Sequence, residues 1–285
     1  MSTDEPSISG EFGLTPDTCI IDGKGEFVAA GVTSLVELLP NGDIIKTPWN
    51  NPFRDCVQDL TTEAKIYQML GEHPRLVKIR NWDSTEHTMI MEYMPHGTLK
   101  QYIENHYEDV SRPLQLRWAR QAAEGLQPLH AFDILHCDVG PHNFLLDASL
   151  DLKIADFSGS SINGSYASVC PGSRYRAPDP QWRPGKPQSS NEDLFALGSV
   201  FYFIFTGKVP FPELEEDEVA KKYKAGVFPD LSEVLYSDII TLCWQQHAGS
   251  AQQTYEAIDR LCVAGNIWPY VPYSEAAATK PAVYR

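Results

Sequence analysis

The chain has 285 residues, of which 42% are hydrophobic and 21% are charged. This composition is typical of a folded globular protein and excludes a mainly disordered or fibrous one. The 38 acidic residues outnumber the 23 basic ones and give a formal charge of −15, which repels polyanions, so we expect no binding to nucleic acid or to a membrane surface.

The first third of the chain has the pattern of strands with one helix. The turn Pro40-Asn41-Gly42-Asp43 lies between two apolar runs, which is a strong hairpin signal. Apolar residues at spacings of three and four between Val57 and Tyr67 predict a helix that ends at Gly71. Residues 76–79 and 88–93 are predicted to form two further strands.

Pro95-His96-Gly97 is a turn signal, and helix predominates after it. Residues 116–130 have the spacing of a long amphipathic helix. The apolar stretch 194–205 is shorter than the roughly 20 residues of a membrane span, so we predict a buried helix there. A strand-rich first part followed by a helix-rich remainder predicts an α+β fold with two lobes and a cleft where they meet.

No segment near the amino terminus has the apolar character of a signal peptide. The six cysteines form neither a CxxC pair nor a cluster at zinc-ligand spacing, which favours reduced thiols. We therefore expect the protein to be cytoplasmic or nuclear, and not secreted.

Chemistry-bearing side chains are concentrated in two short segments. The first reads His136-Cys137-Asp138-Val139-Gly140-Pro141-His142-Asn143, and the second, Asp156-Phe157-Ser158, follows it. Two carboxylates and an amide on loops between strands can hold a divalent cation on nucleotide phosphates and accept a proton from a hydroxyl group. The pattern indicates phosphoryl transfer, and the segments resemble the HRDxxxxN and DFG motifs of the protein kinase family.

The resemblance covers about residues 27–265, with its motifs in the family's order. The matching residues are Lys46 for the lysine of VAIK, Glu63 for the glutamate of helix C, Met91 to Met94 for the gatekeeper and hinge, Ala177-Pro178-Asp179 for APE, and Asp193 for the helix that supports the catalytic loop. It implies a bilobal, α+β protein kinase-like fold. The implied boundaries are a flexible tail over 1–11, a domain over 12–270 with an N-lobe of about 12–91, a hinge over 92–97 and a C-lobe over 98–270, and a second tail over 271–285.

The resemblance also implies a role for each site residue, with ATP and Mg²⁺ as cofactors. Asp138 would orient and deprotonate the substrate hydroxyl, and Asn143 and Asp156 would hold Mg²⁺. Lys46, fixed by Glu63, would hold the α and β phosphates. The implied ATP-binding residues are Gly31, Val36, Ile44, Lys46, Met91, Glu92, Met94 and Leu145. Tyr67, His136 and Phe157 would form a stack that assembles when the helix and the metal loop are placed for catalysis.

Several positions depart from the family pattern. Gly31 is the one glycine left in the phosphate-binding loop, and Ile44 replaces a smaller alanine, so both changes act on nucleotide binding. Cys137 replaces an arginine that in many kinases receives a phosphorylated activation loop, which predicts a non-RD kinase without that switch. Gly140 replaces a lysine or arginine that helps neutralise the γ-phosphate. Ser158 replaces the glycine of DFG and is expected to reduce backbone freedom.

Three functions are compatible with the sequence. The leading one is an ATP-dependent protein kinase that phosphorylates a serine or threonine of a protein substrate and acts as a monomer. The acidic run Glu213–Glu218 would suit a basic substrate, although most such runs are solvated helix faces. The alternatives are a pseudokinase scaffold, favoured by the eroded glycine loop, and a small-molecule phosphotransferase of the aminoglycoside or choline type. The departures together are similar to those of short, divergent kinase-like proteins of filamentous fungi.

Overall fold

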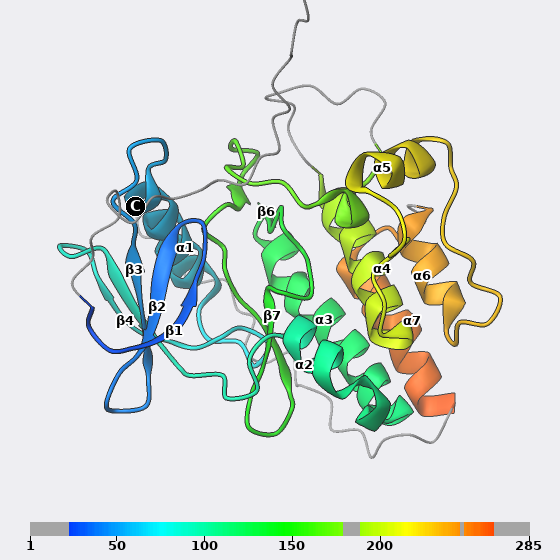
Figure 1. Cartoon of the computed structure of the whole chain (residues 1–285), viewed down its shortest axis with the longest axis horizontal. Helices are drawn as coiled ribbons and strands as arrows, with labels where there is room; N and C mark the ends of the chain where they lie inside the picture. Colours follow the sequence, from blue (N-terminus) through cyan, green and yellow to red (C-terminus); the bar gives the residue numbers. More distant parts are fainter. Residues whose placement is uncertain (1–22, 179–188, 246–247, 265–285) are drawn as a thin grey trace, which may run out of the picture.

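The computed structural model describes residues 23–178, 189–245 and 248–264, arranged in two lobes (Figure 1). The predicted tails, the predicted domain limits at residues 12 and 270, and Asp179 lie outside these ranges. The strands are β1 (Glu26–Ala30), β2 (Ser34–Leu38), β3 (Ile44–Pro48), β4 (Ile79–Asp83), β5 (Thr88–Met91), β6 (Ile134–Leu135), β7 (Phe144–Leu146), β8 (Leu152–Ile154) and β9 (Ser161–Ile162). The α-helices are α1 (Cys56–Leu70), α2 (Leu99–His106), α3 (Arg112–Ala131), α4 (Ser190–Thr206), α5 (Glu216–Lys224), α6 (Ser237–Trp244) and α7 (Ala251–Ala264).

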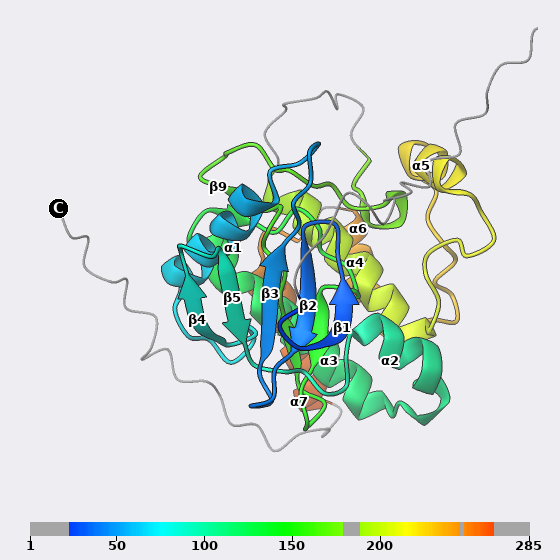
Figure 2. The same cartoon turned by 60° about the vertical axis from the view of Figure 1, so that its left-hand side comes forward.

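The N-terminal lobe is an antiparallel sheet with strand order β1-β2-β3-β5-β4, joined by helix α1 (Figure 2). The hairpin predicted at residues 40–43 is present, and Gly42 takes the left-handed conformation there (φ 88°), which glycine adopts without steric cost. In the register of the sheet, Val36 lies opposite Lys46 and Ile44 lies opposite Met91. Because directly paired residues point to the same side of a sheet, these four side chains share one face.

Helix α1 begins and ends where the sequence predicts. The Asp55 side chain accepts a hydrogen bond from the backbone N–H of Gln58 and caps the first turn. At the other end Gly71 is in the left-handed region (φ 68°), and its N–H donates to the carbonyl of Tyr67. Glu63 lies on the buried face of the helix, which places a carboxylate under the sheet.

The strand predicted at residues 76–79 is wrong in position, since β4 starts at Ile79. Leu76 and Val77 are apolar because they are buried against the other lobe, each 2% exposed. The N–H of Val77 donates to the carbonyl of Ile154 (3.2 Å). An apolar run marks burial, and here the partner is β8 (Leu152–Ile154) of the other lobe, with which Leu76 forms an isolated parallel bridge, and not a strand of the N-terminal sheet. The next predicted strand, 88–93, is present but ends at Met91.

The C-terminal lobe is built around the buried helix predicted from the apolar stretch 194–205, which is α4. This helix packs closely on α6: a Cβ on Gly198 would lie 2.7 Å from the Cβ of Cys243, a separation that real Cβ atoms do not adopt. The long amphipathic helix predicted at 116–130 is α3. None of the helices in the described ranges is long and apolar enough to cross a bilayer.

Asp193 joins helix α4 to the loop between β6 and β7. Its carboxylate accepts hydrogen bonds from the backbone N–H groups of His136 and Cys137, both at 2.9 Å, and from the ring of His130 at 3.0 Å. Burial favours its neutral form, but these hydrogen bonds more than compensate and lower its pKa. Cys137 is in the left-handed region (φ 66°), which costs a non-glycine residue about 1–2 kcal/mol. The Asp193 carboxylate holds this strained backbone in place, as the resemblance implies.

Replacement of Asp193 by alanine should therefore destabilise the fold. Three buried donors would lose a charged acceptor, and we expect the free energy of unfolding to fall by about 3 kcal/mol and the melting temperature to fall by roughly 6–12 °C. Thermal denaturation checks this, with Asp217→Ala as the control because Asp217 is an exposed acid whose partner is Lys221 on the same helix. Equal melting temperatures for the two variants would contradict the assigned role.

Candidate active site

A buried ion pair links the two lobes. Lys46 on β3 extends its ammonium to Oε2 of Glu63 on α1 (2.6 Å) and to Oδ1 of Asp156 after β8 (3.1 Å). The side chains of Lys46 and Glu63 are 8% and 0% exposed, whereas that of Asp156 is 44% exposed. Glu63 and Asp156, which are 17 and 110 positions from Lys46 in the chain, thus meet it at one point. The structure brings these predicted site residues together, while their roles toward a nucleotide stay predictions.

In this cluster, opposite charges offset the cost of burying each ionised group. Burial on its own would lower the pKa of Lys46, but the carboxylates of Asp156 and Glu63 raise it above its ordinary value. The surroundings of Asp156 favour its neutral form, yet the charge and hydrogen bond of Lys46 and the Ser158 hydroxyl hold its pKa at about 2. Lys46 and Asp156 are therefore both ionised at neutral pH, as a cation for phosphate and a ligand for a metal ion require.

Asp138 and Asn143 lie in the loop between β6 and β7. The Asn143 amide donates from Nδ2 to the backbone carbonyl of Asp138 (2.8 Å) and to its Oδ2 (3.1 Å). The carbonyl of Asn143 accepts from the N–H of Ala155 (3.0 Å), the residue before Asp156. This bond places Asn143 beside Asp156, so the two predicted metal ligands belong to adjacent segments.

The donor set fits Mg²⁺. Oδ2 of Asp156 and Oδ1 of Asn143 form no hydrogen bond to any residue in the described part of the chain, which leaves two oxygen ligands free. Over the same residues there is no group of three or more His, Cys, Asp or Glu that could hold a metal ion. Mg²⁺ commonly takes one or two protein oxygens and completes its octahedron with water and substrate phosphates. Asn143 and Asp156 are thus adequate for Mg²⁺ that arrives with ATP.

Three aromatic rings pack together beside the ion pair. Tyr67 on α1 and His136 at the start of the catalytic loop both contact Phe157, with ring centroids 5.1 Å and 5.4 Å away in edge-on geometry. All three residues are buried. The stack predicted from Tyr67, His136 and Phe157 is therefore formed, and α1 is placed so that Glu63 reaches Lys46.

The predicted adenine-contacting residues come from both lobes. Val36 and Ile44 are half-buried and share the sheet face of Lys46, and Leu145 on β7 is also half-buried. Leu145 forms an isolated bridge with Thr98, just past the hinge. Partial exposure suits side chains that line a cleft open to a ligand, so these positions are compatible with an adenine site.

The backbone of the predicted hinge has an acceptor and a donor that no described residue uses, on Glu92 and Met94. Glu92 uses its N–H on the carbonyl of Lys78 (2.9 Å) and its side chain on Lys153 (2.5 Å). Neither the Glu92 carbonyl nor the Met94 N–H is hydrogen-bonded to any described residue. The edge of adenine offers an amino donor beside a ring acceptor, which would match this pair. Met91, the predicted gatekeeper, lies on β5 and is 2% exposed.

The β1–β2 turn at Gly31 is anchored rather than loose. The indole Nε1–H of Trp49 donates to the carbonyl of Gly31 (2.9 Å), and the backbone N–H of Trp49 donates to the carbonyl of Thr33 (3.0 Å). Thr33 also contacts the Ser158 hydroxyl (3.5 Å), and that hydroxyl donates to Oδ1 of Asp156 (2.9 Å). The sequence did not indicate this chain of contacts. Ser158 is absent from the residues with positive φ, so its side chain, not strain, is what distinguishes it from glycine.

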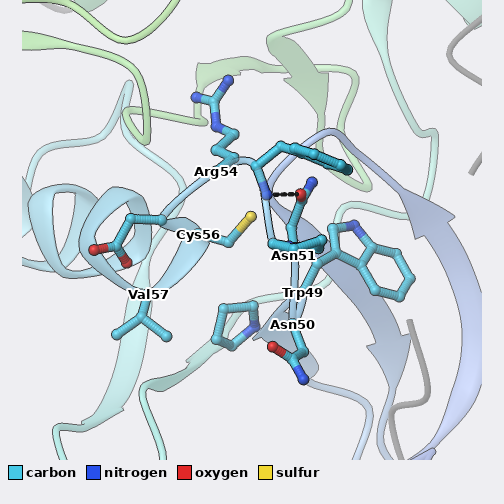
Figure 3. A pocket seen from close by; sticks show the side chains of 10 residues that line it. Trp49, Asn50, Asn51, Arg54, Cys56 and Val57 are labelled. Carbon is cyan, nitrogen blue, oxygen red and sulfur yellow. Dashed lines mark hydrogen bonds between the residues drawn. The ribbon is translucent and has the colours of Figure 1, made fainter. Parts of the chain in front are cut away.

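A pocket of about 670 Å³ lies beside the end of β3 and the start of α1 (Figure 3). Residues 48–57 line it, and none of them is a predicted nucleotide contact. The bond drawn in Figure 3 joins the N–H of Phe53 to Oδ1 of Asn51 (2.9 Å) and closes the turn before α1. The pocket lies next to the candidate site, but its lining contains none of the predicted site residues.

The segment after Asp156 is tied to α1 through a second set of contacts missed in the sequence. Arg54 donates to Oδ2 of Asp59 (2.5 Å) and to the Ser168 hydroxyl (3.0 Å), and Ser168 donates to Oδ1 of Asp59 (2.9 Å). Ser168 and Asp59 are 109 residues apart. The sequence does not predict this contact, because helix and strand periodicity relates only residues a few positions apart.

The family model that describes the protein kinase domain matches residues 44–262. The chain belongs to the protein kinase family. The match includes Lys46, Glu63, Asp138, Asn143 and Asp156, and it begins after the anchored β1–β2 turn, the part of this kinase that departs furthest from the family motif.

Curated kinases align with this chain at low identity. Serine/threonine-protein kinase RAD53 of Saccharomyces cerevisiae is 26% identical over 259 residues, which cover 80% of this kinase and 30% of RAD53. Two Dictyostelium discoideum proteins named as probable serine/threonine-protein kinases are 26% and 30% identical, over 65% and 61% of this kinase and over 12% and 11% of their own lengths. The chain spans less than a third of the length of these relatives. Its likeness to the short fungal proteins stays a prediction.

Loss of Lys46 should destabilise the kinase in a pH-dependent way. In Lys46→Met the buried Glu63 loses its cation, and burial then raises its pKa further. An acid whose pKa is higher in the folded than in the unfolded protein favours folding while it is protonated, at low pH, and this contribution is lost as the pH rises. We therefore expect Lys46→Met to lower the free energy of unfolding by about 3 kcal/mol at pH 8 and by less at pH 5.5.

Denaturation at the two pH values measures this effect. Lys46→Met/Glu63→Gln should recover stability at pH 8, because the buried charge is then gone. Lys221→Met, with a side chain that is 74% exposed in the wild type, is the control. A loss independent of pH, with no recovery in the double variant, would rule out this account of the pair.

Proposed function

We propose that this kinase transfers the γ-phosphate of ATP to a serine or threonine hydroxyl of a protein substrate, with Mg²⁺ as cofactor. The observation that carries the proposal is the assembled cluster of Lys46, Glu63 and Asp156, backed by the ring stack of Tyr67, Phe157 and His136. The names of the relatives support serine or threonine as the acceptor.

Each residue then has a task in the transfer. Lys46 holds the α and β phosphates, and Asn143 and Asp156 bind Mg²⁺, which neutralises charge that develops on the phosphates. Asp138 orients the substrate hydroxyl through its carboxylate. The hydroxyl oxygen forms a bond to the γ-phosphorus, the bond from that phosphorus to the β–γ bridging oxygen breaks, and the hydroxyl proton passes to Asp138 as ADP leaves.

Activity without phosphorylation of the activation segment is part of this proposal. Cys137 stands where an arginine would bind a phosphate, and burial raises the pKa of its thiol. The segment is instead held by contacts that need no phosphate, among them the Ser168 hydroxyl between Arg54 and Asp59. The guanidinium of Arg54, a cation that suits a phosphate, is already paired with the Asp59 carboxylate.

A pseudokinase scaffold is the second candidate. The observation that favours it is the β1–β2 turn, where Gly31 is the one glycine of the motif and its carbonyl is occupied by Trp49. A turn fixed in this way has less freedom to close over phosphates. The small-molecule phosphotransferase has no such observation in its support.

The cysteines support a reducing compartment, the cytoplasm or the nucleus. In the described part of the chain Cys137, Cys170, Cys243 and Cys262 form no disulfide, as is usual where disulfides do not persist. A monomer acting on a protein substrate remains our proposal. The basic-substrate option is weakened because Glu216 of the acidic run is paired with Arg174.

Binding of MgATP should raise the melting temperature of the kinase. A ligand at 100 times its Kd stabilises a folded protein by about 2.7 kcal/mol, which corresponds to several degrees here. Thermal-shift titration to millimolar MgATP measures this, with Lys46→Met and Asp156→Asn expected to reduce the shift and Lys221→Met expected to retain it. No shift for the wild type would exclude kinase activity.

Transfer of radiolabelled phosphate to a generic basic protein should occur and should depend on Asp138. Since positioned acid–base groups contribute about 10²–10⁴ in rate, Asp138→Asn should lose activity on the order of 100-fold. Protein pretreated with a phosphatase should keep its activity. Binding of MgATP without transfer to any of a panel of protein substrates would favour the scaffold, and loss of activity after phosphatase treatment would refute phosphorylation-independent control.

A further inference from the structure

Asp138 has a neighbour that the kinase motifs do not assign. The ring Nε2 of His142 lies 3.1 Å from Oδ2 of Asp138, and the Asn143 amide donates to the same oxygen at 3.1 Å. We propose, on the basis of the proposed function above, that His142 is a positioning residue that orients the Asp138 carboxylate, and that Gly140 is glycine in order to admit its ring.

The contact with His142 decides which oxygen of Asp138 faces the substrate. The torsion that turns an aspartate carboxyl is broad and has no strong preference of its own, so hydrogen bonds must fix it. Both donors, from His142 and Asn143, lie on Oδ2. Oδ1 forms no hydrogen bond within the ranges that the structure describes and is therefore the oxygen available to a substrate hydroxyl.

The reason for a glycine at position 140 is the space that the His142 ring occupies, and not the backbone conformation of Gly140. It is absent from the glycines with positive φ, so its conformation is open to any residue. A Cβ at this position would lie 2.5 Å from Cε1 and 2.7 Å from Nδ1 of His142, well inside van der Waals contact. The ring of His142 occupies the space where any side chain at position 140 would begin.

The two positions therefore form one unit. The resemblance implies a lysine or arginine at position 140 in related kinases, and here the ring of His142 takes up that space and contacts Asp138 directly. A lysine restored at position 140 must displace the ring, so Gly140→Lys by itself would break the His142–Asp138 contact. The effects of changes at 140 and 142 should consequently not multiply as independent losses do.

Steady-state kinetics with MgATP tests the positioning role. We expect His142→Ala to lower kcat by about ten- to a hundred-fold, the order of loss that misoriented catalytic groups cause, with KM for ATP unchanged. His142→Gln keeps an N–H donor and should retain most of kcat. Gly140→Ala, which adds the Cβ without a charge, should lower kcat, and Gly140→Ala/His142→Ala should be no slower than Gly140→Ala. His106→Ala, at the exposed end of α2, is the control.

A kcat for His142→Ala equal to that of the wild type would overturn the inference, and so would a double variant whose loss is the product of the two single losses. Absence of transfer by the wild-type kinase would defeat the proposed function instead. In that event a second measurement, independent of activity, decides the inference.

Nuclear magnetic resonance of protein labelled with ¹⁵N-histidine provides this measurement at fixed pH. The chain has eight histidines, and the signal of His142 is identified by its absence from His142→Gln. We expect a hydrogen on Nε2, and a change of the His142 ring shifts in both Asp138→Ala and Gly140→Ala. Ring shifts that stay the same in both variants would overturn the contact.

Discussion

The buried ammonium of Lys46 between Glu63 and Asp156 is the constraint on which the rest of the structure depends. A buried charge is stable only with its partners in place, so α1 must lie against the sheet and the segment after β8 must face it. The ring stack through Phe157 secures the same arrangement from the apolar side. Among the contacts between the two lobes, this electrostatic contact and this packing contact lie on successive residues, Asp156 and Phe157.

The C-terminal lobe presents its chemistry through a strained loop. Cys137 and Asp156 are both left-handed, with φ values of 66° and 63°. Such conformations persist when the surrounding structure over-determines them. Asp193 does this for Cys137 by binding two successive N–H groups. Lys46 and the Ser158 hydroxyl hold the Asp156 side chain, so both segments that carry the predicted site residues are fixed by contacts within the protein.

Two departures from the kinase motifs, Ser158 and Gly140, are explained by contacts in the structure. Ser158 was expected only to remove freedom, yet its hydroxyl connects Asp156 to Thr33. Gly140 was expected only to remove a cation, yet it admits the ring of His142. Neither partner could be named in advance, because Thr33 is 125 residues from Ser158 and because a glycine without positive φ carries no local signal. The misplaced strand at 76–79 has the same origin, since Leu76 and Val77 contact Ile154 of the other lobe and are not part of the N-terminal sheet.

The sequence by itself determined the α+β class, the two lobes, the hairpin at 40–43, the limits of α1 and the residue types of the site, because periodicity and turn residues act over a few positions of the chain. The tertiary structure alone decided that Lys46 reaches both carboxylates, that Ser168 connects the activation segment to α1, and that His142 contacts Asp138. The contacts of Lys46 and Ser168 arise when segments far apart in the chain pack together, which local pattern does not describe. His142 and Asp138 are four residues apart, but their contact depends on the path of the loop backbone and on side-chain directions that residue types alone do not specify.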